Sequence, residues 1–392
     1  MSLIEITDPT NDRYATLNLI SWWDQDRLRD ARVMVVGAGA LGNEVLKNLA
    51  LLGIGHVFLI DFDTVEVANL TRSVLFRMGD AGRRKVDVAA AGVRDINPDV
   101  RITEFHGDVT KDIGLGVYRR MDVVLGCLDN RAARFAVNRA CQRMGVPWID
   151  GGMDVLMGTA RVFVPGKGAC YECTMTEQDY DLMNLRYSCP LLRPEDVDQG
   201  RVPTTPTTAS IVAALQVQEA VRLLHGMEVP GGHGIYFNGH TRSMSTLSYA
   251  RRADCCSHER YSPVIELDVA SAELTVGGLL DLMAERVGGS VTLLLDFEVV
   301  ANLFCPACKV SEPAWVRFEE AVPARVPCPA CGGYRLPQVT NRLSAMPELA
   351  GVPLSQTGIR LLDVLVGESA GERLFFELSG DETTVLERWG KQ

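Results

Sequence analysis

Residues 33–63 constrain the fold more than any other stretch, because they join an apolar run, a glycine-rich turn, a helical pattern and a second apolar run. The first run is Val33–Val36, and the second ends at Asp61. The three glycines of the turn are Gly37, Gly39 and Gly42. A G-x-G-x-x-G turn between a strand and a helix is typical of a dinucleotide-binding unit.

The residue types in this pattern suit a nucleotide. Gly37 and Gly39 let the backbone turn tightly and approach a phosphate, and Gly42 lets the helix pack close to the sheet. The helix N-terminus presents unpaired N–H groups to an anion. Asp61 stands where a carboxylate accepts hydrogen bonds from ribose hydroxyls. The pattern therefore predicts adenine-nucleotide binding, the alternative being a structural turn without a ligand. It does not distinguish NAD, FAD and ATP.

The composition excludes several classes of partner. The 392 residues suffice for two or more domains, and 47% hydrophobic with 23% charged residues is ordinary for a globular protein. A net charge of -11 argues against general nucleic-acid or membrane-surface binding. No apolar run reaches membrane-spanning length and the N-terminus lacks a signal pattern, so we expect a cytoplasmic protein. Six of the eleven cysteines fall in C-x-x-C pairs, which indicates zinc.

The residues after the turn continue the alternation of strand and helix. Helical patterns cover residues 81–96 and 132–144, and apolar strand-like runs cover residues 101–106, 122–127 and 146–149. We predict an α/β fold with a doubly wound, Rossmann-like parallel sheet, whose ligands lie beyond the carboxyl ends of the strands.

The pattern changes after residue 151. We predict an antiparallel strand over residues 159–164, a crossover loop over residues 174–207 and a helix over residues 208–225 that Thr208 caps. A loop this long inside a compact domain is usually functional or mobile.

A boundary near residues 251–262 divides the chain into predicted domains of residues 1–260 and 261–392. The second reads as a smaller α+β domain, compatible with a β-grasp module, that carries a zinc ribbon over residues 305–331. Its predicted elements are a helix over residues 276–286 and strands over residues 264–269, 291–295, 361–366 and 374–378.

Several polar side chains near the first two strands suit MgATP better than NAD. Arg72 and Lys85 supply cations for a triphosphate, Asp129 supplies a carboxylate for Mg²⁺, and Asp63 and Asn69 add further polar groups. NAD carries only a pyrophosphate and needs no metal, so a dehydrogenase is disfavoured. Taken singly, Arg72 and Lys85 also read as solvated charges and Asp129 as a helix cap.

Together these features resemble the ubiquitin-activating-enzyme family, which includes the ThiF/MoeB adenylyltransferases. The resemblance covers about residues 10–260 and rests, in the family's order, on VVGAGALGNEVLKNLALLGIGHVFLIDFDTVEVANLTR, Lys85, CLDN at 127–130, ACYECT at 169–174 and PTTPTTASIVAALQVQEAVRLL. It implies a homodimeric or pseudo-dimeric enzyme that uses ATP and Mg²⁺ to adenylate the C-terminal glycine of a ubiquitin-like protein. Asp61 would then hold the ribose, Asp129 the magnesium, and Asn69, Arg72 and Lys85 the phosphates.

Two positions depart from the family's pattern. The family often has a second arginine three residues after Arg13, which reaches into the partner's active site; here that position is Thr16. Either Arg13 substitutes for it or the contact in trans is absent. The residue after Arg72, often Gln, is Ser73 here.

Adenylation converts a carboxylate, which is a poor electrophile, into an acyl adenylate with a good leaving group. Cysteine is the usual nucleophile that then attacks the adenylate. Cys189 lies in the crossover region, where family members that form thioesters carry their nucleophile. The alternative is an ordinary packed cysteine, as Cys127 and Cys141 are expected to be. Three arginines would lower the pKa of Cys189, or are simply solvated: Arg186, Arg193 and Arg201.

Two zinc sites are expected. The family completes Cys170 and Cys173 with a later C-x-x-C pair, and Cys255 and His258 keep that spacing here, with Cys256 as a rival ligand. The second set has zinc-ribbon spacing and consists of Cys305, Cys308, Cys328 and Cys331. Both sites read as structural, with a redox role as the alternative.

We therefore interpret the chain as a bacterial-style ubiquitin-activating enzyme that forms a thioester on Cys189 and hands it to a conjugating enzyme. The bacterial assignment is a hypothesis that rests on the compact single chain and the segment NLTRSVLF. A sulfur-carrier adenylyltransferase is the alternative enzyme, and a nucleotide-binding scaffold without catalysis is the alternative of another class. No nucleic-acid or membrane partner is expected.

Overall fold

The computed structural model describes residues 11–180, 204–321 and 327–386. This part of the chain divides into two compact units. The first contains the chain up to Asp112 together with Tyr118–Arg260, and the second contains Ile113–Val117 together with Tyr261–Val385. A short segment from the first half of the sequence thus belongs, by its contacts, to the second unit.

The first unit is built on an eight-stranded sheet in the order β3-β2-β1-β4-β5-β6-β7-β8. Strands β1 to β5 run parallel, and β6 to β8 continue the sheet in antiparallel pairs. The strands are β1 Arg32–Val36, β2 His56–Asp61, β3 Arg101–His106, β4 Val123–Gly126, β5 Trp148–Met153, β6 Met157–Phe163, β7 His233–Asn238 and β8 Ser243–Ser248. The predicted parallel sheet with an antiparallel extension is confirmed.

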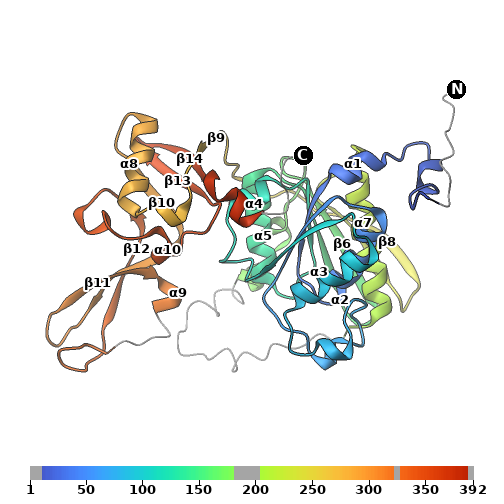
Figure 1. The fold of residues 1–392 in the computed structure, drawn as a ribbon, viewed down its shortest axis with the longest axis horizontal. Coiled ribbons are helices and arrows are strands. Elements are labelled where there is room, and N and C mark those ends of the chain that lie inside the picture. Colours follow the sequence, from blue (N-terminus) through green and yellow to red (C-terminus); the bar gives the residue numbers. More distant parts are fainter. Residues whose placement is uncertain (1–10, 181–203, 322–326, 387–392) are drawn as a thin grey trace. The chain divides into compact units, whose positions relative to one another are not determined.

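Helices cover both faces of this sheet, with α2, α3 and α7 on one face and α5 on the other (Figure 1). The helices are α1 Gln25–Asp30, α2 Ala40–Leu52, α3 Lys85–Ile96, α4 Leu115–Arg119, α5 Arg131–Met144 and α7 Pro206–Leu224. Val45 and Leu49 of α2 are buried in one core with Val33 and Val57 of the neighbouring strands. The sheet is therefore doubly wound, as predicted. No helix in the described part of the chain has both the length and the hydropathy of a bilayer-spanning segment.

Two predicted helix starts are wrong for identifiable reasons. Helix α3 begins at Lys85 rather than at residue 81, because the preceding backbone pairs with the loop after β2, where the Val65 N–H donates to Arg83 O at 2.8 Å. Helix α7 is capped by Thr205, whose Oγ1 accepts the Thr208 N–H at 3.3 Å. The proline at the first position of α7 was the missed signal.

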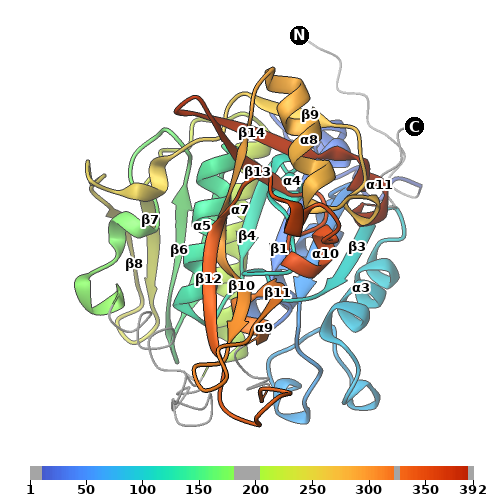
Figure 2. The ribbon, with the colours of Figure 1, turned by 90° about the vertical axis from the view of Figure 1, so that its left-hand side faces the viewer.

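The second unit is α+β, as predicted, with a six-stranded sheet that contains the path β11-β10-β13-β14-β9 and β12 paired to β10. Its strands are β9 Val264–Leu267, β10 Thr292–Phe304, β11 Ser311–Arg317, β12 Leu336–Leu343, β13 Val364–Ser369 and β14 Glu372–Leu378. Its helices are α8 Val276–Val287, α9 Phe318–Ala321, α10 Leu354–Thr357 and α11 Glu382–Val385. Helix α8 lies over the sheet (Figure 2). Its Leu279 and Met283 are buried in one core with Leu293 and Phe376. The short strand predicted over residues 291–295 is in fact the beginning of the long β10.

The segment Ile113–Val117 is hydrogen-bonded to the remainder of the second unit. The Leu115 N–H donates to Asp363 Oδ1 at 3.0 Å, and the Gly116 N–H donates to Leu362 O at 2.9 Å. Asp363 is 3% exposed, and burial raises the pKa of its carboxyl group. The second unit therefore depends on residues that precede it by more than a hundred positions.

Candidate nucleotide site and zinc centres

Three parallel strands of the first unit end at the same level. Val36 at the end of β1 is opposite Ile60 of β2 and Gly126 of β4. The Gly37 N–H donates to Ile60 O, and the Cys127 N–H donates to Val36 O, both at 2.8 Å. The glycine turn, the end of β2 and the loop after β4 therefore share one edge of the sheet, as the sequence predicts.

The three glycines of the turn have different surroundings. Gly37 has φ +100°, and a Cβ there would lie 2.5 Å from Cys127 O. A Cβ on Gly42 would lie 1.9 Å from Gly37 O, whereas a Cβ on Gly39 would meet nothing within 4 Å. Gly39 is also the N-cap of α2 and offers no side chain to the first N–H groups. The fold thus requires Gly37 and Gly42, while the space beside Gly39 at the helix N-terminus fits a phosphate.

Asp61 accepts two backbone hydrogen bonds at the end of β2. Its Oδ2 accepts the Ala38 N–H and its Oδ1 accepts the Asp63 N–H, both at 2.7 Å. Burial raises the pKa of Asp61, against the opposing effect of these N–H groups and of Lys85. Each oxygen keeps a lone pair, so the carboxylate can also accept ribose hydroxyls.

Asp63 and Lys85 form an ion pair. Lys85 Nζ lies 2.7 Å from Asp63 Oδ2, and the Lys85 N–H donates to Asp63 O at 3.0 Å. Lys85 is the first residue of α3 and is only 9% exposed. The second acid that the sequence singled out therefore holds the predicted phosphate-binding lysine at the start of its helix.

Asn69 and Arg72 lie on the loop between β2 and α3. Asn69 Oδ1 accepts the Glu66 N–H at 3.0 Å, and Arg72 Nη1 donates to Ala68 O at 3.0 Å. Both hydrogen bonds stay within the loop, and no hydrogen bond described for these two side chains reaches another element. Arg72 is partly exposed.

A residue that the sequence reasoning missed connects this loop to the glycine turn. Asn43 on α2 is fully buried; its Nδ2 donates to Ala38 O at 2.8 Å and to Gly39 O at 3.0 Å. Its Oδ1 accepts the Leu75 N–H at 2.9 Å. A polar residue on the buried face of an amphipathic helix was the available signal.

Asp129 follows β4 and is exposed. Among the described residues, its carboxylate accepts a 3.3 Å hydrogen bond from Asn130 Nδ2. Asn130, rather than Asp129, caps α5, because its Oδ1 accepts the Ala133 N–H at 2.8 Å. The alternative reading of Asp129 as a helix cap is therefore wrong. An exposed carboxylate beside a phosphate site suits Mg²⁺, which proteins usually bind with one or two carboxylates plus substrate phosphates.

A buried ion-pair network beneath this loop was also missed. Asp150 on β5 is fully buried and contacts Arg134 Nε at 2.9 Å and Arg161 Nε at 3.1 Å. Arg134 Nη2 also donates to Leu128 O at 2.5 Å and to Gly151 O at 3.0 Å. Arg161 meets Asp150 through the register of β5 and β6, and Arg134 meets it from α5, so local spacing in the sequence does not reveal the network.

The first predicted zinc ligands lie together. Cys170 Sγ is 3.6 Å from Cys255 Sγ, and Cys173 Sγ is 3.4 Å from His258 Nε2. All four ligand atoms lie within 4.8 Å of one another. Sulfurs bound 2.3 Å from a tetrahedral zinc would be about 3.8 Å apart, so the spacing fits zinc. The rival ligand Cys256 is exposed and lies outside the cluster.

The second predicted set also forms a cluster that fits zinc. Cys305 Sγ is 3.5 Å from Cys331 Sγ, and Cys308 Sγ is 3.4 Å from Cys328 Sγ. Backbone hydrogen bonding from Cys308 lowers the pKa of Cys305 to about 6, which favours the thiolate that a metal requires.

Cys189 lies outside the described residues, as do the three arginines predicted near it. The segments that flank it are described. Asp179 Oδ1 lies 2.9 Å from Arg131 Nε, and Thr205 Oγ1 donates to Val155 O at 2.9 Å. Cys127 and Cys141 are buried, and burial raises the pKa of both thiols.

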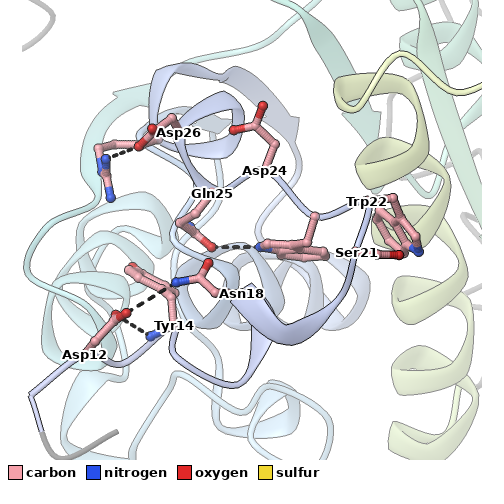
Figure 3. Close-up of a pocket in the computed structure, with 10 residues that line it drawn as sticks. Asp12, Tyr14, Asn18, Ser21, Trp22, Asp24, Gln25 and Asp26 are labelled. Carbon is pink, nitrogen blue, oxygen red and sulfur yellow. Dashed lines mark hydrogen bonds and ion pairs between the residues drawn. The ribbon is translucent and has the colours of Figure 1, made fainter. Parts of the chain in front are cut away.

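In a hollow of about 510 Å³ near the N-terminal segment, several of the lining polar groups pair with one another (Figure 3). Trp23 Nε1 donates to Gln25 Oε1 at 3.0 Å, and Asn18 Nδ2 donates to Asp12 Oδ2 at 3.3 Å. The predicted residue Arg13 is exposed, and its guanidinium donates to Ile96 O at 3.3 Å. Some of the polar groups around the hollow are therefore already engaged with their neighbours.

A wound parallel sheet with a glycine turn, an acid at the end of β2 and a second acid after β4 defines an adenine-nucleotide-binding α/β protein. The model of the ThiF family matches residues 11–258. The chain belongs to this family of adenylating enzymes.

Three curated relatives show the range of this family. The chain is 33% identical over 238 residues to the SAMP-activating enzyme E1 of Haloferax volcanii. The aligned region covers 59% of the chain and 81% of that protein. It is 29% identical over 255 residues to the sulfur carrier protein ThiS adenylyltransferase of Escherichia coli, with 64% and 96% covered. It is 40% identical over 149 residues to the SUMO-activating enzyme subunit 2 of Dictyostelium discoideum, with 38% and 22% covered.

A solved structure supports the same fold. Escherichia coli MccB with ATP matches with a TM-score of 0.53 and 25% identity, over 66% of this chain and 77% of that one.

The chain spans only about a fifth of the length of the SUMO-activating subunit. The activity of that whole protein is therefore only a proposal for this chain.

Proposed function

We propose that this protein uses MgATP to adenylate the C-terminal glycine of a ubiquitin-like protein. The observation that carries the proposal is the meeting of the glycine turn, Asp61 and the loop of Asp129 at one edge of the sheet. In this proposal Asp61 holds the ribose and Asp129 holds the metal. Asn69, Arg72 and Lys85 contact the phosphates. The SAMP-activating relative, most of whose length the chain covers, supports this substrate class.

The reaction needs charge stabilisation and correct placement. A carboxylate oxygen of the substrate attacks the α-phosphorus of ATP, the bond to the β-phosphate oxygen breaks, and pyrophosphate leaves. The bound Mg²⁺ would neutralise phosphate charge. Arg72 and Lys85 would stabilise the negative charge that develops on the α-phosphate. Asp63 holds the Lys85 side chain in place at the start of α3 through their ion pair.

ATP–pyrophosphate exchange that depends on a small protein ending in glycine tests this proposal. Asp129→Ala should lower the exchange rate by about a hundredfold or more, since it removes the metal carboxylate. Asp87→Ala is the matched control, because Asp87 is exposed on α3. Equal loss in both variants, or exchange that persists in Asp129→Ala, would contradict the proposal.

The second half of the proposal is a thioester on Cys189 that passes to a conjugating enzyme. The flanks of the segment that holds Cys189 are tied to residues that follow β4 and β5, which supports delivery of a nucleophile to this edge. The thiolate would attack the adenylate carbonyl and release AMP. Cys189→Ala should abolish an adduct that thiol reductants cleave, yet leave pyrophosphate exchange intact.

A sulfur-carrier adenylyltransferase is the second candidate, favoured by the match over nearly the full length of the ThiS adenylyltransferase. A thiocarboxylate product, with no reductant-sensitive adduct on Cys189, would select it. Absence of any exchange would leave a nucleotide-binding scaffold. We also propose that both cysteine clusters hold structural zinc and that the protein is a homodimer, which zinc analysis and sedimentation would test.

A further inference from the structure

Burying the charged groups of the Asp150 network carries a large desolvation cost. Asp150 has no exposed surface, and β-sheet register places Arg161 directly opposite it on β6. Arg134 reaches the same carboxylate from α5. Buried ion pairs often add little to stability compared with apolar replacements. A network of this kind is therefore better explained by the geometry that it fixes.

Arg134 fixes the backbone immediately before the proposed metal ligand. Its Nη2 donates to Leu128 O at 2.5 Å and to Gly151 O at 3.0 Å, while its Nε is held by Asp150. The Leu128 carbonyl belongs to the peptide that joins Leu128 to Asp129. Holding that peptide sets the direction in which the Asp129 side chain leaves the backbone.

The Asp129 side chain itself has little else to orient it. It is exposed, and the one hydrogen bond described for it, from Asn130 Nδ2, is long at 3.3 Å. Asn130 is in turn occupied with the cap of α5. The direction of the carboxylate therefore depends on the backbone of the loop.

Arg161, the other arginine of the network, contacts residues outside the loop of Asp129. Arg161 contacts Asp150 and lies 5.0 Å from the centre of the Tyr171 ring. Tyr171 follows Cys170 of the first cysteine cluster, and its N–H donates to Asn138 Oδ1 at 2.9 Å. Arg161 shares the buried carboxylate with Arg134, but no contact between Arg161 and Leu128 is described.

We propose that Arg134, anchored on Asp150, is a positioning residue that presents the Asp129 carboxylate to the divalent metal of bound ATP. This inference rests on the proposed function. It assigns to Arg134 the role that hydrogen-bonding partners behind metal ligands have in general, where their loss weakens metal affinity by about 10- to 100-fold. Lysine at this position keeps the charge but cannot reach Asp150 and both carbonyl oxygens at once.

The test compares Arg134→Lys with Arg161→Lys in the full-length protein. Mn²⁺ binding in the presence of a non-hydrolysable ATP analogue is measured by electron paramagnetic resonance, together with the Mg²⁺ dependence of pyrophosphate exchange. Arg134→Lys should weaken Mn²⁺ binding by about 10- to 100-fold, and excess Mg²⁺ should restore the maximal exchange rate. Arg161→Lys and Arg139→Lys, on the same helix as Arg134, should retain the Mn²⁺ affinity of the wild type.

Equal Mn²⁺ affinity in Arg134→Lys and the wild type would overturn the inference and leave the proposed function intact. So would an equal loss in Arg161→Lys, because that result would assign the effect to the buried ion pairs in general. A wild type that binds no Mn²⁺ with the ATP analogue would overturn the proposed function itself. If Arg134→Lys does not fold, Arg134→Gln replaces it with the same expected loss, because Asp150 then keeps its partner Arg161.

Discussion

Gly39 and Gly42 are close in sequence but have opposite reasons to lack a side chain. Gly42 touches the backbone of the turn, whereas Gly39 borders open space. We therefore assign the absence of a side chain at Gly39 to ligand binding and its absence at Gly42 to packing of the fold. This difference separates binding from stability in two otherwise similar substitutions.

Gly39→Ala should leave the free energy of unfolding within about 1 kcal/mol of the wild type, because its φ of −73° suits alanine. It should weaken ATP binding by about tenfold or more, since the methyl group occupies the phosphate space. Gly42→Ala should instead lower the free energy of unfolding by about 1–3 kcal/mol through overpacking. Thermal unfolding and titration with an ATP analogue check both, and a weakly destabilised Gly42→Ala would contradict this assignment.

Asp61 predicts a pH dependence of nucleotide binding. Its carboxyl pKa lies above the ordinary 3.8 because of burial, and the ionised form is the one that accepts ribose hydroxyls. ATP affinity should therefore fall as the pH is lowered through this raised value. The native state holds this proton more tightly than the unfolded chain does, so the contribution of Asp61 to stability falls as pH rises through the same interval.

Titrations with an ATP analogue between about pH 4 and about pH 7 measure the first effect, and thermal unfolding measures the second. Asp61→Asn should remove this part of both pH dependences. An affinity that falls equally with pH in Asp61→Asn would assign the effect to another group.

Single residues differ in how far the sequence reveals them. The glycine turn and Asp61 were predictable because strand, turn and helix follow one another directly. Arg134 and Asp150 were not, since their contact depends on how α5 packs on β5 rather than on local spacing. Asn43 was overlooked because its partners, Ala38 O and the Leu75 N–H, come from two different loops.

At the scale of elements, prediction succeeded where periodicity and spacing are local. The helices and strands predicted for residues 33–164 of the first unit are present apart from shifts at their ends, but α4, β7 and β8 were not predicted. Strand β10 was predicted too short, because its irregular register between Leu294 and Val299 and between Val300 and Asn302 interrupts the alternation of side chains. Each C-x-x-C pair was predictable because its spacing is a property of one turn, whereas the joining of Cys170 and Cys173 with Cys255 and His258 was expected only from the family resemblance.

Zinc content should identify the ligands of the first cluster. Wild-type protein should contain two zinc ions per chain, one for each cluster. Cys256→Ser should retain both, because its Sγ lies outside the first cluster, whereas Cys255→Ser should lose one. Atomic emission on purified protein measures the stoichiometry. Loss of zinc from Cys256→Ser but not from Cys255→Ser would reverse the assignment.

Cys328→Ser should separate the two clusters by function. It should remove the zinc of the second unit and destabilise the paired loops around it. Pyrophosphate exchange should persist, because the proposed nucleotide site lies in the first unit. Loss of exchange with the first zinc still bound would show that the second unit takes part in adenylation.

At the scale of the whole molecule, the two compact units do not coincide with two continuous stretches of sequence. The domain division at residue 260 stays a proposal, and the second unit consists of Tyr261–Val385 together with Ile113–Val117. No sequence signal near Leu115 announces this, because its partner Asp363 is 248 positions away.

A fragment of residues 261–392 should therefore be less stable than the same residues in the intact protein. It would leave the buried Asp363 carboxylate without the Leu115 N–H, at a cost of about 1–3 kcal/mol. Denaturation of the fragment, compared with the intact chain, measures the deficit. A peptide with the sequence of residues 113–117 and its neighbours should restore part of it, and a scrambled peptide should not.

The hydrogen bond between Leu115 and Asp363 also bears on how such proteins diversify. Because the donor is a backbone N–H, any residue other than proline at position 115 would preserve this hydrogen bond. The bond therefore constrains position 363 more than position 115, and homologues that recombine in the C-terminal third should remain compatible as long as both parents carry an acceptor at position 363.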